Sequence, residues 1–226
     1  MSISGGGKPM DSPQQITDRI TTFFAREIAS DARNSYHSWE HCYNFFATRP
    51  TNLDLASLHL GFYLASWGMY RGSAAIRNFD YLIHRPAAEE LLKPDYDPLR
   101  GASLDELVSR FDTGLWPLIE KIRKQGLYPK SVTMTDTLVT KILMGTLGCA
   151  PAYDRFFKAG LEEKGLNSSF SRKNFEAFLR NCQQNQQGFT DAQGQIQQTS
   201  NYPVMRVVDM YFHGIGLESP WIADDE

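Results

Sequence analysis

Lys141 is the residue of this chain whose type and position most clearly indicate a chemical role. It lies in the segment 133–160, TMTDTLVTKILMGTLGCAPAYDRFFKAG, which predicts two helices around a Gly/Pro turn, and its neighbours include Val139 and Ile142. A lysine in such surroundings either extends its stem to water or is held in a desolvated site. Asp154 stands where the second predicted helix begins and is the natural ionic partner. A desolvated amine can act as a nucleophile beside a carboxylate that stabilises positive charge, whereas the alternative is a lysine reaching water and an aspartate that only caps a helix.

The run TLVTKILMG...APAYD resembles the lysine-to-aspartate segment of the helix-hairpin-helix, 8-oxoguanine-type DNA glycosylases. In that family the lysine attacks C1′ of the sugar, and an aspartate at the next helix N-terminus assists departure of the base. The resemblance implies an all-helical protein with Lys141 as nucleophile and Asp154, after Pro151, as the assisting carboxylate. It covers residues 133–160. The family's Gly-rich hairpin is missing, because KSVTMTD stands there, and the turn is shorter, so the amides that would hold a DNA phosphate are unaccounted for.

The residues His37, Glu40 and His41 have the letters H-x-x-E-H, the spacing of inverted zincin peptidases. Positions i and i+4 place both imidazoles on one helix face, as zinc binding requires. A catalytic zinc also needs a third protein ligand, for which the chain has only generic candidates. The alternative is a pair of histidines hydrogen-bonded at the edge of an aromatic-rich helix. We therefore predict no metal and no cofactor.

Arg77 and His84 are similar in type and spacing to the R-x(4–6)-H motif of HEPN ribonucleases. In those all-α, usually dimeric proteins, the histidine can serve in acid–base chemistry and the arginine can hold the scissile phosphate. The alternative places Arg77 on a solvated helix face and His84 at a helix C-terminus, where the helix dipole favours it.

Arg155 and Lys158 are the candidates for contact with a nucleic-acid backbone. They follow Asp154 in DRFFKAG, and their i, i+3 spacing places them on one helix face. The formal net charge of −3 gives no global attraction to nucleic acid or acidic lipid. A nucleic-acid partner therefore requires a local patch such as this pair, and the alternative is a solvated helix face.

The cysteines and the chain start indicate a cytoplasmic protein without membrane contact. Cys42, Cys149 and Cys182 are odd in number and contain no CxxC motif, which favours reduced thiols over a disulfide framework. The start, MSISGGGKPMDSPQQ, lacks the apolar region of a signal peptide. No apolar run approaches the length of about 18 residues that would indicate a membrane span. Oligomeric state is not indicated.

Helix signals dominate the chain, and strand signals are scarce. Ser12-Pro13 predicts a helix start, Ser103 with Glu106 predicts a capping box, and Pro203 opens a last apolar helix. The segment 55–70, LASLHLGFYLASWGMY, is apolar almost all round, which predicts a helix buried at the centre of a bundle. The segment 73–84, SAAIRNFDYLIH, predicts a further helix up to Pro86.

Composition completes the expected architecture. Apolar content of 42% and charged content of 22% are those of an ordinary globular protein. We expect a flexible leader over 1–12 and a single all-α domain over 13–226, folded as a compact multi-helix orthogonal bundle. The polar, low-complexity run 183–201 predicts a mobile loop. For function, we rank nucleic-acid processing of helix-hairpin-helix DNA glycosylase/lyase type first. A non-enzymatic all-α binding protein and a HEPN-like ribonuclease remain alternatives.

Overall fold

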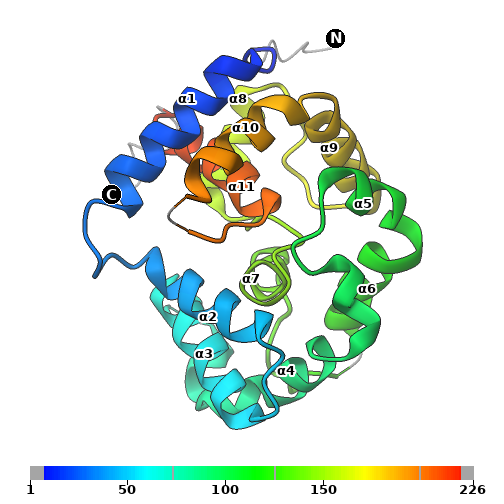
Figure 1. Cartoon of the computed structure of the whole chain (residues 1–226). Helices are drawn as coiled ribbons and strands as arrows, with labels where there is room; N and C mark the ends of the chain where they lie inside the picture. The colour runs from blue at the N-terminus through cyan, green and yellow to red at the C-terminus, as the bar shows by residue number, and fades with distance from the viewer. Residues whose placement is uncertain (1–7, 73, 125, 199, 220–226) are drawn as a thin grey trace.

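One buried helix, α7 (Asp136–Thr146), organises the fold. The computed structural model describes residues 8–72, 74–124, 126–198 and 200–219. Figure 1 shows α7 end-on in the middle of the molecule, and every residue from Leu138 to Thr146 is buried. Because no face of this part of the helix meets water, the side chains Thr140 and Lys141 must find their polar partners inside the protein.

The described residues form helices and short helical turns, and no strand occurs among them, which confirms the all-α class. Tighter or wider helical turns lie at Phe24–Ile28, Ala75–Asn78, Tyr81–His84, Pro94–Leu99 and Phe111–Leu115. The α-helices are α1 (Pro13–Phe23), α2 (His37–Ala47), α3 (Leu53–Ser66), α4 (Arg85–Leu91), α5 (Leu104–Ser109), α6 (Trp116–Lys124), α7 (Asp136–Thr146), α8 (Arg155–Glu163), α9 (Arg172–Gln184), α10 (Gln186–Ile196) and α11 (Val204–Leu217).

The helices surround α7 on several sides. In Figure 1, α2, α3 and α4 lie below it, α1, α10 and α11 above it, and α5 and α6 along the right. Since α7 is seen end-on while α1 and α2 are seen from the side, the helices cross steeply, as in the orthogonal bundle that the sequence predicts. One connected hydrophobic core includes side chains from all of these helices.

Helices α8 and α11 pack with their backbones in contact, because each has a glycine at the crossing. A Cβ on Gly160 would lie 2.7 Å from the carbonyl carbon of Phe212, and one on Gly216 would lie 2.7 Å from that of Phe156. No real Cβ approaches so closely, so only glycine permits this distance between the helices. The crossing holds the start of α8, at Phe156, against the C-terminal end of α11, at Gly216.

The predicted helix starts are confirmed. Ser12 forms a capping box with Gln15 at the start of α1, and Ser103 forms one with Glu106 at the start of α5. Pro203 immediately precedes α11. These signals depend on hydrogen bonds within a few residues, so packing elsewhere does not change them.

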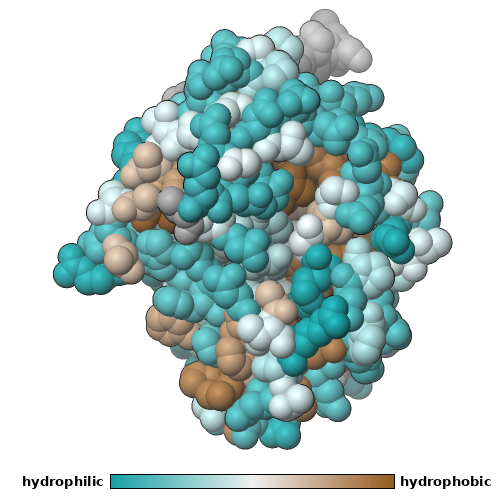
Figure 2. All heavy atoms as spheres, viewed as in Figure 1, coloured by the Kyte–Doolittle hydropathy of each residue, from teal (hydrophilic) through white to brown (hydrophobic). Residues whose placement is uncertain are grey.

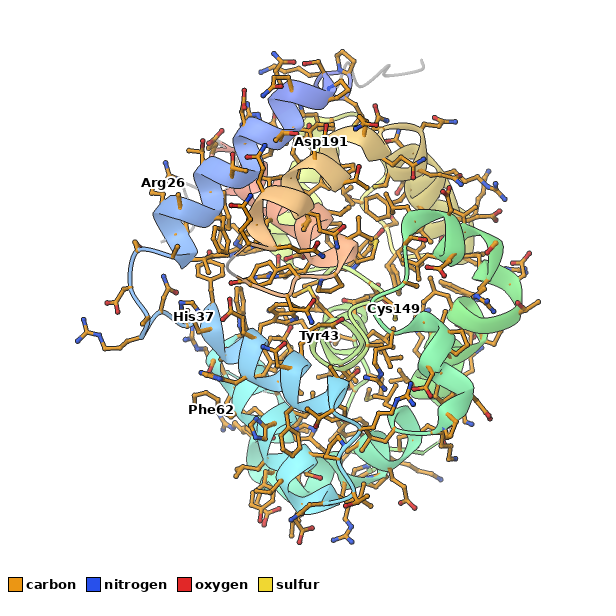
Figure 3. The ribbon with its side chains drawn as sticks, viewed as in Figure 1. Arg26, His37, Tyr43, Phe62, Cys149 and Asp191 are labelled. Carbon is orange, nitrogen blue, oxygen red and sulfur yellow. The ribbon has the colours of Figure 1, made fainter. Side chains whose placement is uncertain are left out.

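The prediction that 55–70 forms the central helix is wrong. Within α3, Leu55, Leu58 and Phe62 face solvent, and Phe62 is 58% exposed. Figure 3 shows Phe62 at the edge of the molecule, and Figure 2 shows apolar atoms at the surface in the same lower left region. Helix α7 takes the central place instead. A helix that is apolar almost all round can therefore be buried on one side alone. Its other side then exposes an apolar face to solvent.

The continuous helix predicted over 73–84 is also not formed. Two 3₁₀ turns, Ala75–Asn78 and Tyr81–His84, occupy the described part of this segment. Asp80 separates them, because its carboxylate accepts a hydrogen bond from the backbone N–H of Leu82 at 2.9 Å. A side chain that bonds its own backbone in this way competes with helix continuation.

The mobile loop predicted over 183–201 is replaced by ordered structure, mainly α10. Its buried residues Phe189, Ala192 and Ile196 recur at helical spacing. Gly188 brings the helix close to α1, where the Thr17 hydroxyl donates to the Gly188 carbonyl at 3.0 Å. A few apolar residues and one close contact thus outweigh the polar composition.

The predicted leader 1–12 is held to the protein over the residues that the structure describes; residues 1–7 lie outside them. The Lys8 N–H donates to the Glu163 carbonyl at 2.9 Å. The Asp11 carboxylate accepts from Lys164 at 2.6 Å and from the Tyr211 hydroxyl at 2.9 Å. Within the described ranges, no helix combines the length and apolar character needed to cross a bilayer.

Candidate active site

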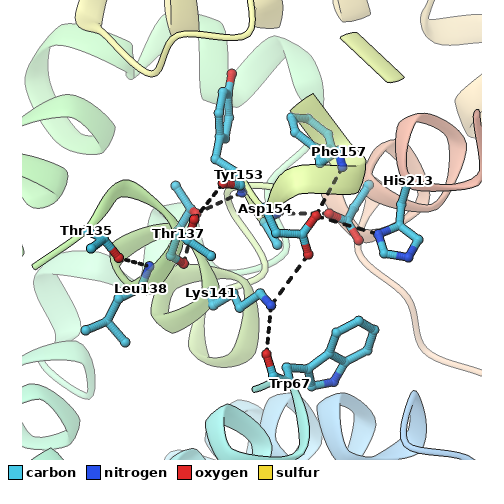
Figure 4. A network of polar contacts seen from close by, with 12 residues as sticks. Trp67, Thr135, Thr137, Leu138, Lys141, Tyr153, Asp154, Phe157 and His213 are labelled. Carbon is cyan, nitrogen blue, oxygen red and sulfur yellow. Dashed lines mark hydrogen bonds and ion pairs between the residues drawn. The ribbon is translucent and has the colours of Figure 1, made fainter. Parts of the chain in front are cut away.

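Lys141 and Asp154 are brought together by α7, α8 and the turn between them (Figure 4). The turn is bonded to α7 through both the backbone N–H and the backbone carbonyl of Tyr153. The Tyr153 N–H donates to the Thr140 hydroxyl at 3.0 Å, and the Tyr153 carbonyl accepts from the Thr137 hydroxyl at 2.8 Å. Thr140 directly precedes Lys141, and Tyr153 directly precedes Asp154. The hydrogen bond between Thr140 and Tyr153 therefore holds the amine and the carboxylate close to each other. The predicted pairing is therefore present and held in place.

The lysine amine lies between two acceptors. Its Nζ is 3.5 Å from Oδ2 of Asp154 and donates to the Trp67 carbonyl at 3.1 Å. The Lys141 side chain is only 4% exposed, so its stem does not reach bulk water. Oδ1 of Asp154 accepts from the Phe157 N–H at 3.1 Å. Asp154 therefore serves as the N-cap of α8 with one oxygen and as partner of Lys141 with the other.

The pair lines a small cavity that several aromatic side chains also line. Its volume is about 250 Å³, and its lining includes Tyr36, Trp67, Phe156 and His213 as well as Lys141 and Asp154. Since a water molecule occupies about 30 Å³ in the liquid, the cavity has room for roughly eight waters or for one planar organic group. The Nζ of Lys141 is 5.3 Å from the centre of the Trp67 ring. A flat, electron-poor or cationic ligand would thus meet ring faces and a carboxylate together.

His213 belongs to this site, and the sequence did not indicate it. Its Nδ1 lies 3.9 Å from Oδ1 of Asp154, on the side away from the lysine (Figure 4). Burial lowers the pKa of His213 below its ordinary value, which favours the neutral imidazole at neutral pH. The available signal was a histidine within the apolar run VMRVVDMYFHG, but nothing local connects that run to α8.

A buried ion pair on α11 supports the turn from the other side. Arg206 donates to Asp209 at 2.7 Å, and Asp209 accepts from the Ala152 N–H at 2.9 Å. Burial raises the pKa of Asp209, although the Arg206 charge acts in the opposite direction. The guanidinium lies 5.7 Å from the centre of the Trp67 ring, so it also contacts a wall of the cavity. Neither charged residue was a sequence candidate.

Arg155 and Lys158 lie on α8 directly after Asp154, but neither lines the cavity. The Arg155 side chain is exposed and its guanidinium lies 4.6 Å from the centre of the Phe156 ring. Among the described residues, no ion pair involves Arg155 or Lys158. Both charges are therefore available at the surface beside the helix start that carries Asp154.

Of the two histidines in the H-x-x-E-H sequence, His37 has protein partners and His41 is exposed. His37 lies 2.8 Å from Glu40 through Nδ1 and 3.1 Å from the Ile28 carbonyl through Nε2. Glu40 also accepts a hydrogen bond from the Tyr202 hydroxyl. These bonds join α2 to two neighbouring segments. Within the described ranges, no three His, Cys, Asp or Glu side chains are grouped so that they could hold a metal ion.

Arg77 and His84 lie in different surroundings. The Arg77 guanidinium is exposed and donates to the Gly72 carbonyl. His84 is fully buried, with Nε2 2.7 Å from the Tyr70 hydroxyl and Nδ1 2.9 Å from the Tyr128 hydroxyl. A ring enclosed in this way has no nitrogen free for a substrate. The geometry therefore gives the ribonuclease alternative no support.

The enclosure of His84 predicts a pH effect on stability. Burial lowers the pKa of His84 from its ordinary value of 6.5 to about 4. Between these values the unfolded chain binds the proton more readily, so acidification favours unfolding. At about 1.4 kcal/mol per pKa unit, lowering the pH from 7 to 4 should cost about 3 kcal/mol through this group.

His84→Gln, whose amide can still bond both hydroxyls, should lose correspondingly less stability over that interval. Urea unfolding of both proteins at pH 7 and pH 4 measures the difference. Equal losses would show that another group is responsible.

No protein-family model, no curated protein and no solved structure matches this chain. The resemblance of 133–160 to DNA glycosylases therefore stays a hypothesis from the residues. Any functional conclusion must come from the geometry of the Lys141–Asp154 cavity.

Proposed function

We propose that this protein is a nucleic-acid-processing enzyme of DNA glycosylase/lyase type, in which Lys141 is the nucleophile and Asp154 the assisting carboxylate. The observation that carries the proposal is the position of the Lys141 amine, 3.5 Å from Asp154 inside a cavity with aromatic walls. The arrangement agrees with the chemistry that the resemblance of 133–160 implies. Arg155 and Lys158 are the proposed contacts to the nucleic-acid backbone.

The reaction assigns a separate task to each group. The amine first loses a proton to the nearby Asp154 carboxylate. The Nζ lone pair then forms a bond to C1′ of the sugar as the bond from C1′ to the base breaks, and the base leaves with the electron pair and takes up the proton from Asp154. The carboxylate restored in this way stabilises the positive charge that develops at C1′. Opening of the sugar ring leaves an imine between Nζ and C1′.

The walls of the cavity suit a base taken out of a helical stack. Enzymes that act on a base place it between aromatic or apolar side chains, which replace part of the lost stacking. Tyr36, Trp67 and Phe156 supply such side chains here. Their placement on three different segments means that the cavity forms only in the folded protein.

The proposed location is the cytoplasm. Cys42, Cys149 and Cys182 are free thiols and are buried. Burial raises the pKa of the Cys149 thiol to about 12, so it stays protonated and unreactive at neutral pH. Free thiols of this kind suit a reducing compartment.

Borohydride trapping tests the proposed chemistry. The wild-type protein is incubated with borohydride and DNA duplexes that carry either an abasic site or 8-oxoguanine, and also with the single strands. Hydride reduces an imine to a stable amine, so we expect a covalent protein–DNA adduct on denaturing gels with the abasic duplex. Failure to form an adduct with any of these substrates would end the glycosylase/lyase proposal.

One observation favours the alternative of a non-enzymatic interaction protein. The outward face of α3 exposes Leu55, Leu58 and Phe62 at helical spacing, and exposed apolar groups of this kind often mark contact surfaces. In that alternative the Lys141–Asp154 pair is structural. The trapping experiment separates the two, because a structural lysine forms no adduct.

A further inference from the structure

A larger cavity adjoins the one that contains Lys141. Its volume is about 720 Å³, and it lies between the segment that follows α3 and the segment that leads into α7. The two cavities share Gly68 and Arg71 in their linings. We call the larger one the Arg71 groove. Figure 4 shows Thr137 and Leu138, which line it, on the same helix as Lys141 and one turn before it.

Arg71 is the charged residue of this groove. Of the described residues that line it, none is acidic and Arg71 alone carries a charge. Across the described ranges, its guanidinium has no ion pair and no hydrogen bond. The guanidinium lies over Gly68, whose φ of +77° favours glycine and whose missing Cβ would be 3.6 Å from Nε of Arg71. These distances place the guanidinium directly beside Gly68, which lines both cavities.

Neutral donors line another part of the groove. Ser131 and Thr133 are exposed there and have no hydrogen-bond partner for their hydroxyls among the described residues. The nearest acidic residue along the chain, Asp136, does not line the groove and is paired with Arg123. The groove therefore combines one unpaired guanidinium with free hydroxyls and no opposing carboxylate. This set of donors suits an anion with several oxygen acceptors.

We infer that the Arg71 groove binds a DNA phosphodiester adjacent to the nucleotide in the lysine cavity, with Arg71 pairing with the phosphate. The inference rests on the proposed function, which supplies the identity of the ligand. Arginine matches phosphate with two parallel N–H donors, and the Ser131 and Thr133 hydroxyls add neutral donors. Because the protein has a net charge of −3, such a local site is what a polyanion requires. In the DNA glycosylases that residues 133–160 resemble, a Gly-rich hairpin precedes the lysine, and residues 130–136 stand there instead. Ser131 and Thr133 belong to this segment and line the groove, so the groove would hold the DNA strand at that position.

Binding of an unreactive DNA tests the inference. The probe is a fluorescein-labelled duplex with one tetrahydrofuran abasic analogue, which has no leaving group at C1′ and forms no imine. Fluorescence anisotropy gives the Kd of the full-length protein at several salt concentrations. Arg71→Gln should weaken binding about tenfold and lower the salt slope by about one, while Arg71→Lys should lie between wild type and Arg71→Gln.

Arg110→Gln is the matched control. Arg110 is exposed and, like Arg71, has no ion pair among the described residues, but it does not line the groove. Its replacement should leave the Kd and the salt slope unchanged. Equal effects of Arg71→Gln and Arg110→Gln, no effect of Arg71→Gln, or no binding by the wild type would each overturn the inference.

The probe also separates this inference from the proposed function. Binding that depends on Arg71, without a borohydride adduct on reactive DNA, would support the groove and end the proposed chemistry. An adduct that forms while binding is indifferent to Arg71 would support the chemistry and overturn the groove assignment. A circular dichroism melt checks that Arg71→Gln is folded, as expected for an exposed and unpaired side chain.

Discussion

Lys141→Gln is expected to abolish the covalent adduct on abasic DNA. Among the described residues that line the lysine cavity, Lys141 alone carries an amine, and the amide of glutamine is not nucleophilic. The protein should remain folded, since the glutamine amide still supplies N–H donors near Trp67 and since Asp154 keeps its bond from Phe157. We expect a loss of about 1–2 kcal/mol in stability from the shorter, uncharged side chain. Denaturing gels after borohydride treatment measure the adduct, and urea unfolding measures the stability.

Lys141→Arg separates loss of the nucleophile from loss of the charge. Arginine keeps a positive charge beside Asp154, but it remains protonated and does not attack carbon. It should therefore give no adduct while staying closer to wild type in stability than Lys141→Gln. An undiminished adduct with either variant would assign the chemistry to another amine. Unfolding of both variants would instead identify Lys141 as a structural partner of Asp154.

Asp154→Asn should slow formation of the adduct without uncapping α8. Asparagine caps helices about as well as aspartate, so the bond to the Phe157 N–H is retained. The negative charge that would stabilise C1′ is lost, and we expect the rate to fall about a hundredfold. A rate equal to that of the wild type would show that the carboxylate has only its capping role.

Gly160→Ala is expected to destabilise the protein by about 3 kcal/mol or more, which corresponds to a melting temperature lower by about 10 °C. The new Cβ would lie 2.7 Å from the carbonyl carbon of Phe212, so backbone rather than a flexible side chain must move. Separation of α8 from α11 would also carry Asp154 away from its present position. Thermal unfolding followed by circular dichroism measures the first effect, and the rate of adduct formation measures the second.

Gly194→Ala is the control for this substitution. Gly194 lies within α10, and a Cβ there would meet no atom within 4 Å. The same chemical change should therefore stabilise the protein by about 0.5–1 kcal/mol through helix propensity. Similar effects at the two positions would contradict the close crossing of α8 and α11.

The pairing of Lys141 with Asp154 was predictable because it is almost local. The two residues lie on consecutive helices joined by a short turn, and the Asp154 cap is itself visible in the sequence. A short connection between helices leaves few ways to separate the end of one from the start of the next. The geometry of the pair was not predictable, because the Trp67 carbonyl that holds the amine comes from a position 74 residues away.

The sequence by itself determined the helical class, the capped starts of α1, α5 and α8, and the apolar character of α7. Each of these depends on hydrogen bonds or side-chain periodicity within a few residues. Only the tertiary structure decided that α7 rather than α3 is central, that Phe189 and Gly188 make a helix of a polar segment, and that His213 faces Asp154. These outcomes depend on which apolar faces cover one another and on glycines at helix crossings. Sequence patterns within a few residues do not specify which distant segments pack against one another. The cavity around Lys141 therefore forms only when those distant segments pack together.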